Sequence, residues 1–117
     1  MPAKKLDITI EQGATFVMNI TWREASGDAV DLTGCTAKMQ ARYKYSDPAA
    51  LVTFTTSDNT ITLGGTAGTI AVSGMAELPG LTAQKIGVYD LEITKTATGK
   101  VTRLLEGAAT FSPEVTK

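Results

Sequence analysis

The sequence predicts an all-β fold, a sandwich or a small barrel of about eight or nine short strands with at most one short helical turn. Apolar and polar residues alternate with a period of two along most of the chain, which is typical of strands that bury one face. Gly, Asn, Asp and Pro interrupt this alternation at intervals of roughly ten residues. No stretch of about 15 residues carries the apolar stripe of a helix, which disfavours folds with crossover helices.

The first strands follow from strict alternation. Apolar and polar residues alternate in 6–11, and Gly13 then breaks the run. In 16–22 every even-numbered residue is apolar, so this face is expected in the core. A polar turn at 24–28 precedes 35–42, where a small apolar face opposes a polar face. The pattern at 35–42 is typical of a half-buried strand in an antiparallel sheet.

The middle of the chain predicts a hairpin. A loop at 43–50 leads to two short strands at 51–55 and 60–63, joined around Asp58 and Asn59. A glycine-rich turn at 64–68 then leads to a strand at 69–72.

The last third contains the one region without clear alternation. Residues 75–78 within it are expected to form a helical turn, limited by Pro79. Alternation resumes at 88–94, and a turn then leads to a strand at 100–106. Two leucines are adjacent in this strand, so the pattern does not determine which of its faces points inward. A last short strand is expected at 109–111.

One domain accounts for the whole chain. Its 117 residues are enough to bury a single core without a metal or a disulfide. We assign 1–117 to one sandwich domain and expect short flexible ends at about 1–5 and 114–117.

Composition argues against several classes of function. The net charge is −1 and no basic run exceeds Lys4-Lys5, so we expect no nucleic-acid partner. Cys35 is the only cysteine, which excludes an internal disulfide and fits synthesis in a reducing cytoplasm. No apolar run approaches the roughly 20 residues of a membrane helix, and no signal peptide is recognisable. We expect a soluble, unsecreted protein without a membrane partner.

The chain contains no histidine, which removes Ser-His-Asp and Cys-His catalysis and most zinc or iron sites. We expect no enzyme activity and no cofactor. Cys35 has the parity of an apolar face and is expected to be a buried, inert thiol.

Three polar clusters invite chemical interpretations, and each has a structural alternative. The loop 64–68 lacks the Lys-Ser/Thr ending of a phosphate loop and precedes a strand, so a turn is expected. Asp90 and Glu92 share an outward strand face, where cross-strand pairing with Lys or Arg is more typical than catalysis. Asp28 and Asp31 do not have calcium-loop spacing, so a metal-free turn is expected.

Two tyrosines are candidate contact residues. Tyr43 and Tyr45 flank a lysine beside a loop, where aromatic side chains can stack on sugars or anchor a partner. Simple packing at the edge of the sandwich is an equal alternative. Trp22 shares the parity of its apolar strand and is expected in the core.

The order of motifs resembles a group of short phage and prophage proteins. They are similar to the immunoglobulin-like N-terminal domain of phage baseplate upper proteins and to related minor tail β-sandwiches. The matching segments are IEQGATF at 10–16, DLTGCTAKMQAR at 31–42, GTI at 68–70, GVYDLEI at 87–93, RLLEG at 103–107 and SPEVT at 112–116. Members of the group can continue into a second region, whereas this sequence ends at Lys117.

The resemblance implies an antiparallel, immunoglobulin-like β-sandwich that serves as a structural component of a tailed-phage virion. It would lie in the tail, baseplate, neck or fibre-attachment assembly and be made in the host cytoplasm. It would form a homo-oligomer within a symmetric assembly and contact other virion proteins. No catalytic residues carry over. Edge strands and chain ends could provide β-augmentation, so the predicted contact residues are Lys4, Lys5, Phe111 and Val115. Deletion of either end is expected to leave a folded monomer that assembles poorly.

Other functions share this predicted architecture. A carbohydrate- or receptor-binding adhesion module is the main alternative, and a capsid decoration protein is another. A small carboxylate enzyme would need two acids converging in a pocket. An unrelated bacterial immunoglobulin-like domain would also fit the strand pattern.

Overall fold

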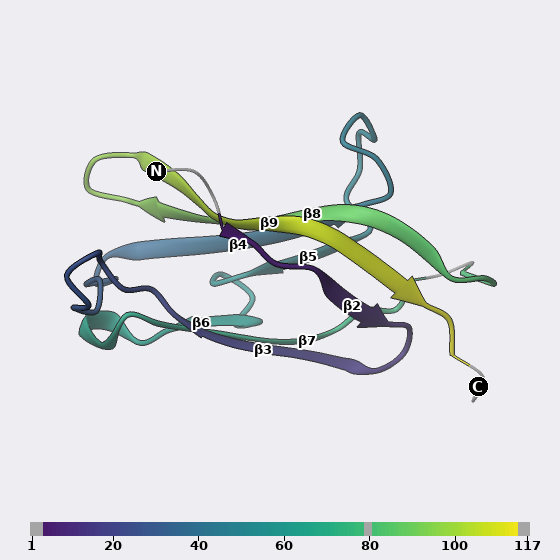
Figure 1. Cartoon of the computed structure of the whole chain (residues 1–117), viewed down its shortest axis with the longest axis horizontal. Helices are drawn as coiled ribbons and strands as arrows, with labels where there is room; N and C mark the ends of the chain where they lie inside the picture. Colours follow the sequence, from purple (N-terminus) through teal and green to yellow (C-terminus); the bar gives the residue numbers. More distant parts are fainter. Residues whose placement is uncertain (1–3, 79–80, 115–117) are drawn as a thin grey trace.

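The computed structural model describes residues 4–78 and 81–114, which form a β-sandwich (Figure 1). Its strands are β1 (Lys4–Lys5), β2 (Ile8–Glu11), β3 (Thr15–Thr21), β4 (Cys35–Arg42), β5 (Val52–Thr55), β6 (Ile61–Leu63), β7 (Thr69–Met75), β8 (Lys85–Lys95) and β9 (Lys100–Ser112). Sheet A has the order β1-β9-β8-β4-β5, with β2 also paired to β9, and sheet B has the order β3-β7-β6. Sheet A is the upper layer in Figure 1 and sheet B the lower layer. The predicted all-β sandwich is confirmed.

The core lies between the two sheets, and the alternation in the sequence explains which residues fill it. In β4, Ala37, Met39 and Ala41 are buried while the residues between them are more exposed. β4 pairs with β8 along its whole length, so Met39 lies opposite Leu91, which is fully buried. The inner face of sheet B contributes Ile70 and its neighbours. Burial of these side chains is the main source of the fold's stability.

A β-bulge resolves the two adjacent leucines of β9. Leu91 lies opposite Leu105, whereas the next residue of β8, Glu92, lies opposite Arg103, so Leu104 is the additional residue. Leu105 is buried, and Leu104 is partly buried and packs against the core.

The predicted hairpin of the two short middle strands is wrong. β5 pairs antiparallel with β4 in sheet A, whereas β6 pairs antiparallel with β7 in sheet B, so the chain crosses between the layers after Thr55. The physical reason is that Phe54 and Ile61 are both buried from opposite sides of the core, an arrangement that a single hairpin could not provide.

The predicted helical turn at 75–78 is also wrong. β7 continues through Met75, which pairs with Thr15 of β3, and cross-strand pairing overrides the local preference. The single helical turn of the described residues is the 3₁₀ turn η1 (Gly65–Ala67), within the predicted glycine-rich turn. It ends at Gly68, whose φ of 69° favours glycine. Pro79 lies outside the described residues.

The N-terminal end is more ordered than the sequence predicts. Lys4 and Lys5, expected in a flexible end, form β1, which is parallel to β9 with Lys4 opposite Leu105. β2 is also parallel to β9, so sheet A is mixed rather than wholly antiparallel. Gly107 allows this close approach, because a Cβ there would lie 2.4 Å from the Leu6 carbonyl oxygen. At the other end, the Glu114 N–H donates to Gln12 Oε1 at 3.0 Å, so Glu114 is also held.

Candidate interaction surface

The two predicted contact tyrosines lie in different environments. Tyr45 is 83% exposed, whereas Tyr43 is half-buried. The Tyr43 ring packs edge-on against Phe111 with centroids 5.3 Å apart, and Lys85 Nζ lies 5.0 Å from its centroid. Tyr43 therefore supports the sandwich edge, and only Tyr45 offers a free aromatic surface.

Hydrogen bonds to Asp47 fix the loop that carries Tyr45. Arg42 Nε donates to the Asp47 carbonyl oxygen at 3.1 Å, and the Lys44 N–H donates to Asp47 Oδ2 at 3.2 Å. Figure 1 shows this loop standing clear of sheet A. The arrangement presents Tyr45 to solvent on a closed turn.

The remaining predicted contact residues divide into three groups. Phe111 is fully buried in the core, so its prediction as a contact residue is wrong. Its side chain lies on the inward face of β9 and packs near Ile10 and Tyr43 instead of facing solvent. Lys4 and Lys5 are exposed on β1. Val115 lies outside the described residues.

The carboxylates of sheet A form an ion-pair cluster around one arginine. Arg103 Nε lies 3.5 Å from Asp90 Oδ2 and 3.8 Å from Glu92 Oε2, and its Nη1 lies 3.6 Å from Glu106 Oε1. Partial burial, with Glu92 close by, raises the pKa of Asp90. This is the cross-strand pairing expected for Asp90 and Glu92.

The other acids serve as turn residues. Asp31 Oδ1 accepts the Thr33 N–H at 2.9 Å, and Asp58 Oδ1 accepts the Thr60 N–H at 2.9 Å. These hydrogen bonds lower the pKa of both carboxyl groups. Asp28 accepts a hydrogen bond from Ser26 rather than joining Asp31. The described residues contain no group of three or more His, Cys, Asp or Glu side chains placed to hold a metal ion.

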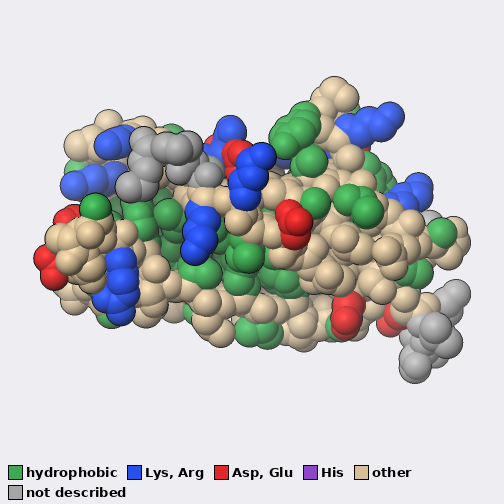
Figure 2. All heavy atoms as spheres, viewed as in Figure 1, with side chains coloured by type: hydrophobic (Ala, Val, Ile, Leu, Met, Phe, Trp, Pro, Cys, Tyr) green, Lys and Arg blue, Asp and Glu red, His purple; other side chains and the backbone are tan. Residues whose placement is uncertain are grey.

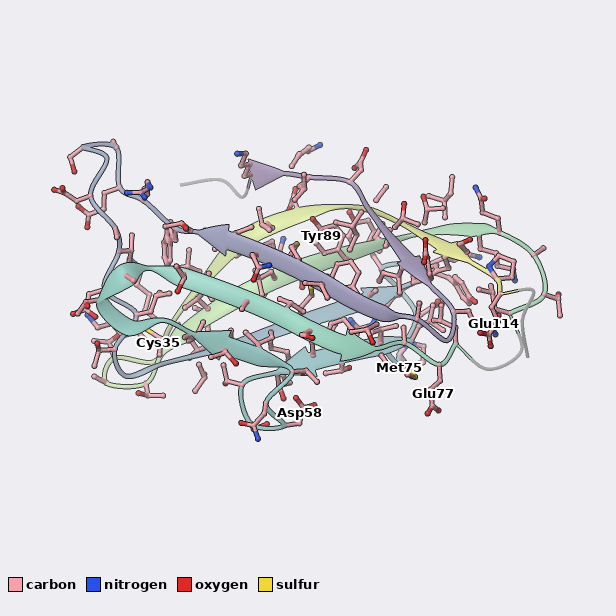
Figure 3. All side chains as sticks on the ribbon, turned by 90° about the horizontal axis from the view of Figure 1, so that it is seen from below. Cys35, Asp58, Met75, Glu77, Tyr89 and Glu114 are labelled. Carbon is pink, nitrogen blue, oxygen red and sulfur yellow. The ribbon has the colours of Figure 1, made fainter. Side chains whose placement is uncertain are left out.

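None of the described residues on the outer face of sheet B is charged. Figure 3 looks onto this face, with Met75 at one end. The strand register and alternating burial place the same-face residues outward. These outward residues are Thr15, Val17, Asn19 and Thr21 of β3, Thr69, Ala71, Ser73 and Met75 of β7, and Thr62 of β6. A typical domain surface is about 25–35% Lys, Arg, Glu and Asp, so a sheet face without any of them is unusual.

The edge of this sheet is open along β3. The Trp22 N–H donates to the Gly68 carbonyl oxygen at 2.8 Å, on the β7 side. Because antiparallel ladders alternate, the backbone groups of Val17, Asn19 and Thr21 then face away from β7. No described strand pairs with that edge. β3 has no charge, proline or bulge, the features that usually protect an edge strand from pairing.

Beside this edge the two sheets leave a groove of about 940 Å³, here called the lateral groove. The end of β3 and the residues after it, from Ile20 to Arg23, form one wall of the groove. β9 from Lys100 to Glu106 forms the other wall, and Lys4 and Leu6 also line the groove. Figure 2 shows hydrophobic side chains in the seam between the layers, with Lys and Arg around it. Sequence reasoning missed both the groove and the β3 edge, although the uncharged run at 15–21 was a detectable signal.

No family model matches the chain, and no curated protein matches it. Among the described residues, no helix is long and apolar enough to span a membrane.

Proposed function

We propose that this protein is a structural assembly module of a tailed-phage virion, which acts through contacts with other proteins. The observation that carries the proposal is the unprotected edge of β3 next to an uncharged sheet face. Exposed strand edges are templates for pairing, and soluble monomers usually block them. The order of sequence motifs adds the resemblance to virion β-sandwich proteins, and the tail, baseplate, neck and fibre-attachment positions all suit such a module.

An assembly role explains why this surface lacks charge. Interface centres are depleted of Lys, Glu and Asp, because a charge buried there loses its hydration. Val17 and Met75 are 59% and 58% exposed on an otherwise small and hydroxylated face. Contact with a neighbouring virion protein, or with a second copy, would cover both side chains without burying a charge.

The test compares charge insertion on the two sheets. We expect the purified chain, alone or with co-expressed neighbouring gene products, to give a discrete complex by light scattering. Val17→Lys should shift the mass toward the monomer, since it places a charge in the contact. Ile86→Lys is the matched control, because Ile86 is 68% exposed on sheet A. Particles from the source strain should also contain the chain by mass spectrometry.

Two results would contradict the proposal. The first is a persistent monomer that ignores its neighbours and is absent from particles. The second is an equal loss of assembly in both variants, which would show that the β3 surface has no special role.

A second candidate function is glycan or receptor binding, which the free ring of Tyr45 favours. Only one tyrosine offers a stacking surface, because Tyr43 is packed against Phe111. A glycan array in which Tyr45→Ala removes a reproducible signal would support this function over assembly.

A further inference from the structure

The lateral groove combines an apolar lining with a basic border. Its apolar side chains come from both layers and include Leu6, Ile20, Trp22 and Leu104. Their partial exposure leaves apolar surface that an occupant could cover. The groove is therefore suited to a chain segment that buries alternate apolar side chains.

The charges of the groove favour a negatively charged occupant. Its charged lining residues are Lys4, Arg23, Lys100, Arg103 and Glu106. Arg103 and Glu106 pair with each other, and Arg103 also meets Asp90 and Glu92. The other three cations form no ion pair with any residue in the described ranges 4–78 and 81–114.

Lys4 is the most informative of these cations. It lies opposite Leu105, whose side chain is buried, and residues opposite each other in a sheet share a face. Lys4 therefore extends toward the groove rather than toward the outer face of sheet A. A lysine placed beside apolar side chains is best satisfied by an anion at the mouth of the groove.

The backbone of β3 supplies the directional part of the site. The N–H and C=O groups of Asn19 and Thr21 face away from β7, and Thr21 lines the groove. A strand laid against them would continue sheet B by main-chain hydrogen bonds. Figure 3 shows the chain from β1 to β2 running beyond the free edge of β3. Lys4 and Leu6 of this stretch line the lateral groove together with Thr21 of β3.

We propose that the lateral groove binds an extended, acidic segment of a partner protein as an additional strand on β3. Apolar side chains of this segment cover Ile20, Trp22 and Leu104, and its carboxylates meet Lys4, Arg23 and Lys100. The identity of the partner as a virion protein rests on the proposed function, whereas strand binding in the groove is a property of this chain alone.

The experiment uses the intact chain and two synthetic octapeptides, one of alternating valine and glutamate and one of alternating valine and lysine. Trp22 is the only tryptophan and lines the groove, so its fluorescence reports occupancy directly. The acidic peptide should shift the tryptophan emission at low salt, and its affinity should fall as the salt concentration rises. It should bind at least about tenfold tighter than the basic peptide. Amide NMR signals of Asn19 and Thr21 should move with the same concentration dependence.

Two variants with one control locate the site. Lys100→Glu should lower the affinity for the acidic peptide about five- to tenfold, because it replaces an attraction with a repulsion. Lys44→Glu, on the exposed Tyr45 loop, makes the same charge change away from the groove and should leave the affinity unchanged. Thr21→Pro removes a backbone N–H from the open edge of β3 and should abolish peptide binding. If this variant unfolds, the comparison of Lys100→Glu with Lys44→Glu still tests the proposal.

The proposal is overturned if the acidic peptide does not bind at millimolar concentration, or if both peptides bind alike. Equal weakening by Lys100→Glu and Lys44→Glu would also overturn it. Peptide failure together with loss of assembly in Val17→Lys would refute the groove and leave the proposed function standing. Peptide binding by a chain absent from virions would do the reverse.

Discussion

Replacement of Tyr89 by Phe tests how the N-terminal edge is attached to the sandwich. Tyr89 lies in β8 and is only 3% exposed, and its hydroxyl donates to the Leu6 carbonyl oxygen at 2.5 Å. This bond joins residues 83 positions apart and fixes the segment between β1 and β2. Tyr89→Phe keeps the ring and removes only the bond, so the core shape is unchanged.

Two effects set the size of the expected change in unfolding free energy. At neutral pH the lost bond leaves the Leu6 carbonyl oxygen without this donor, which should cost about 1–2 kcal/mol of unfolding free energy. Burial, reinforced by the nearby Asp7 carboxylate, raises the pKa of Tyr89 from 10.0 to about 12. That difference corresponds to about 2–3 kcal/mol between the protonation states.

The sign of the pH dependence follows from the raised pKa. The folded chain holds the Tyr89 proton more tightly than the unfolded chain does, so the stabilisation is fully present below about pH 10. It declines as pH rises from about 10 to about 12. The phenylalanine variant lacks this dependence, so its disadvantage at pH 8 should shrink and then reverse in that window.

Urea unfolding of both proteins between pH 8 and pH 12 measures the difference directly, because other titrating groups are common to both. Tyr45→Phe is the control and should follow the wild-type curve, since Tyr45 is 83% exposed. Parallel curves for wild type and Tyr89→Phe across the whole pH range would refute the reasoning.

Three further predictions concern the core and its surface. Phe111→Ala should lower the unfolding free energy by about 3–5 kcal/mol, because the ring is fully buried, whereas Tyr45→Ala should change it by less than about 0.5 kcal/mol in the same urea assay. Gly74→Ala should cost about 1–3 kcal/mol by thermal unfolding, because the new Cβ would lie 2.6 Å from Phe54 Cε1; an unchanged midpoint would show that the ring moves freely. In an NMR titration the Asp90 carboxyl should protonate at a higher pH than a free aspartate, and a midpoint at or below about 3.9 would contradict this.

Local alternation was sufficient to predict most of the strands. The expected strand at 35–42 is β4 without change, and Ala37, Met39 and Ala41 face the core as their parity indicates. Alternation has this power because successive side chains of a strand point to opposite faces, so one face must be apolar when it is buried.

The candidate site was less accessible to sequence reasoning. Tyr45 was correctly placed on an exposed loop, but Phe111 was assigned to a contact although it is fully buried. Its position near the chain end suggested exposure, whereas the parallel pairing of β2 with β9 covers it. The groove joins Lys4 to Trp22 and Lys100, which are far apart in the sequence.

The sequence by itself determined the fold class, the face that most strands bury and the absence of histidine chemistry, because these depend on composition and on a spacing of two residues. Only the tertiary structure decided that β5 and β6 enter different sheets, that β1 and β2 run parallel to β9, and that the edge of β3 stays open beside a basic groove. Strand partners are chosen by long-range burial and by competition for free edges. A local pattern states which face is buried but not which strand lies next to it.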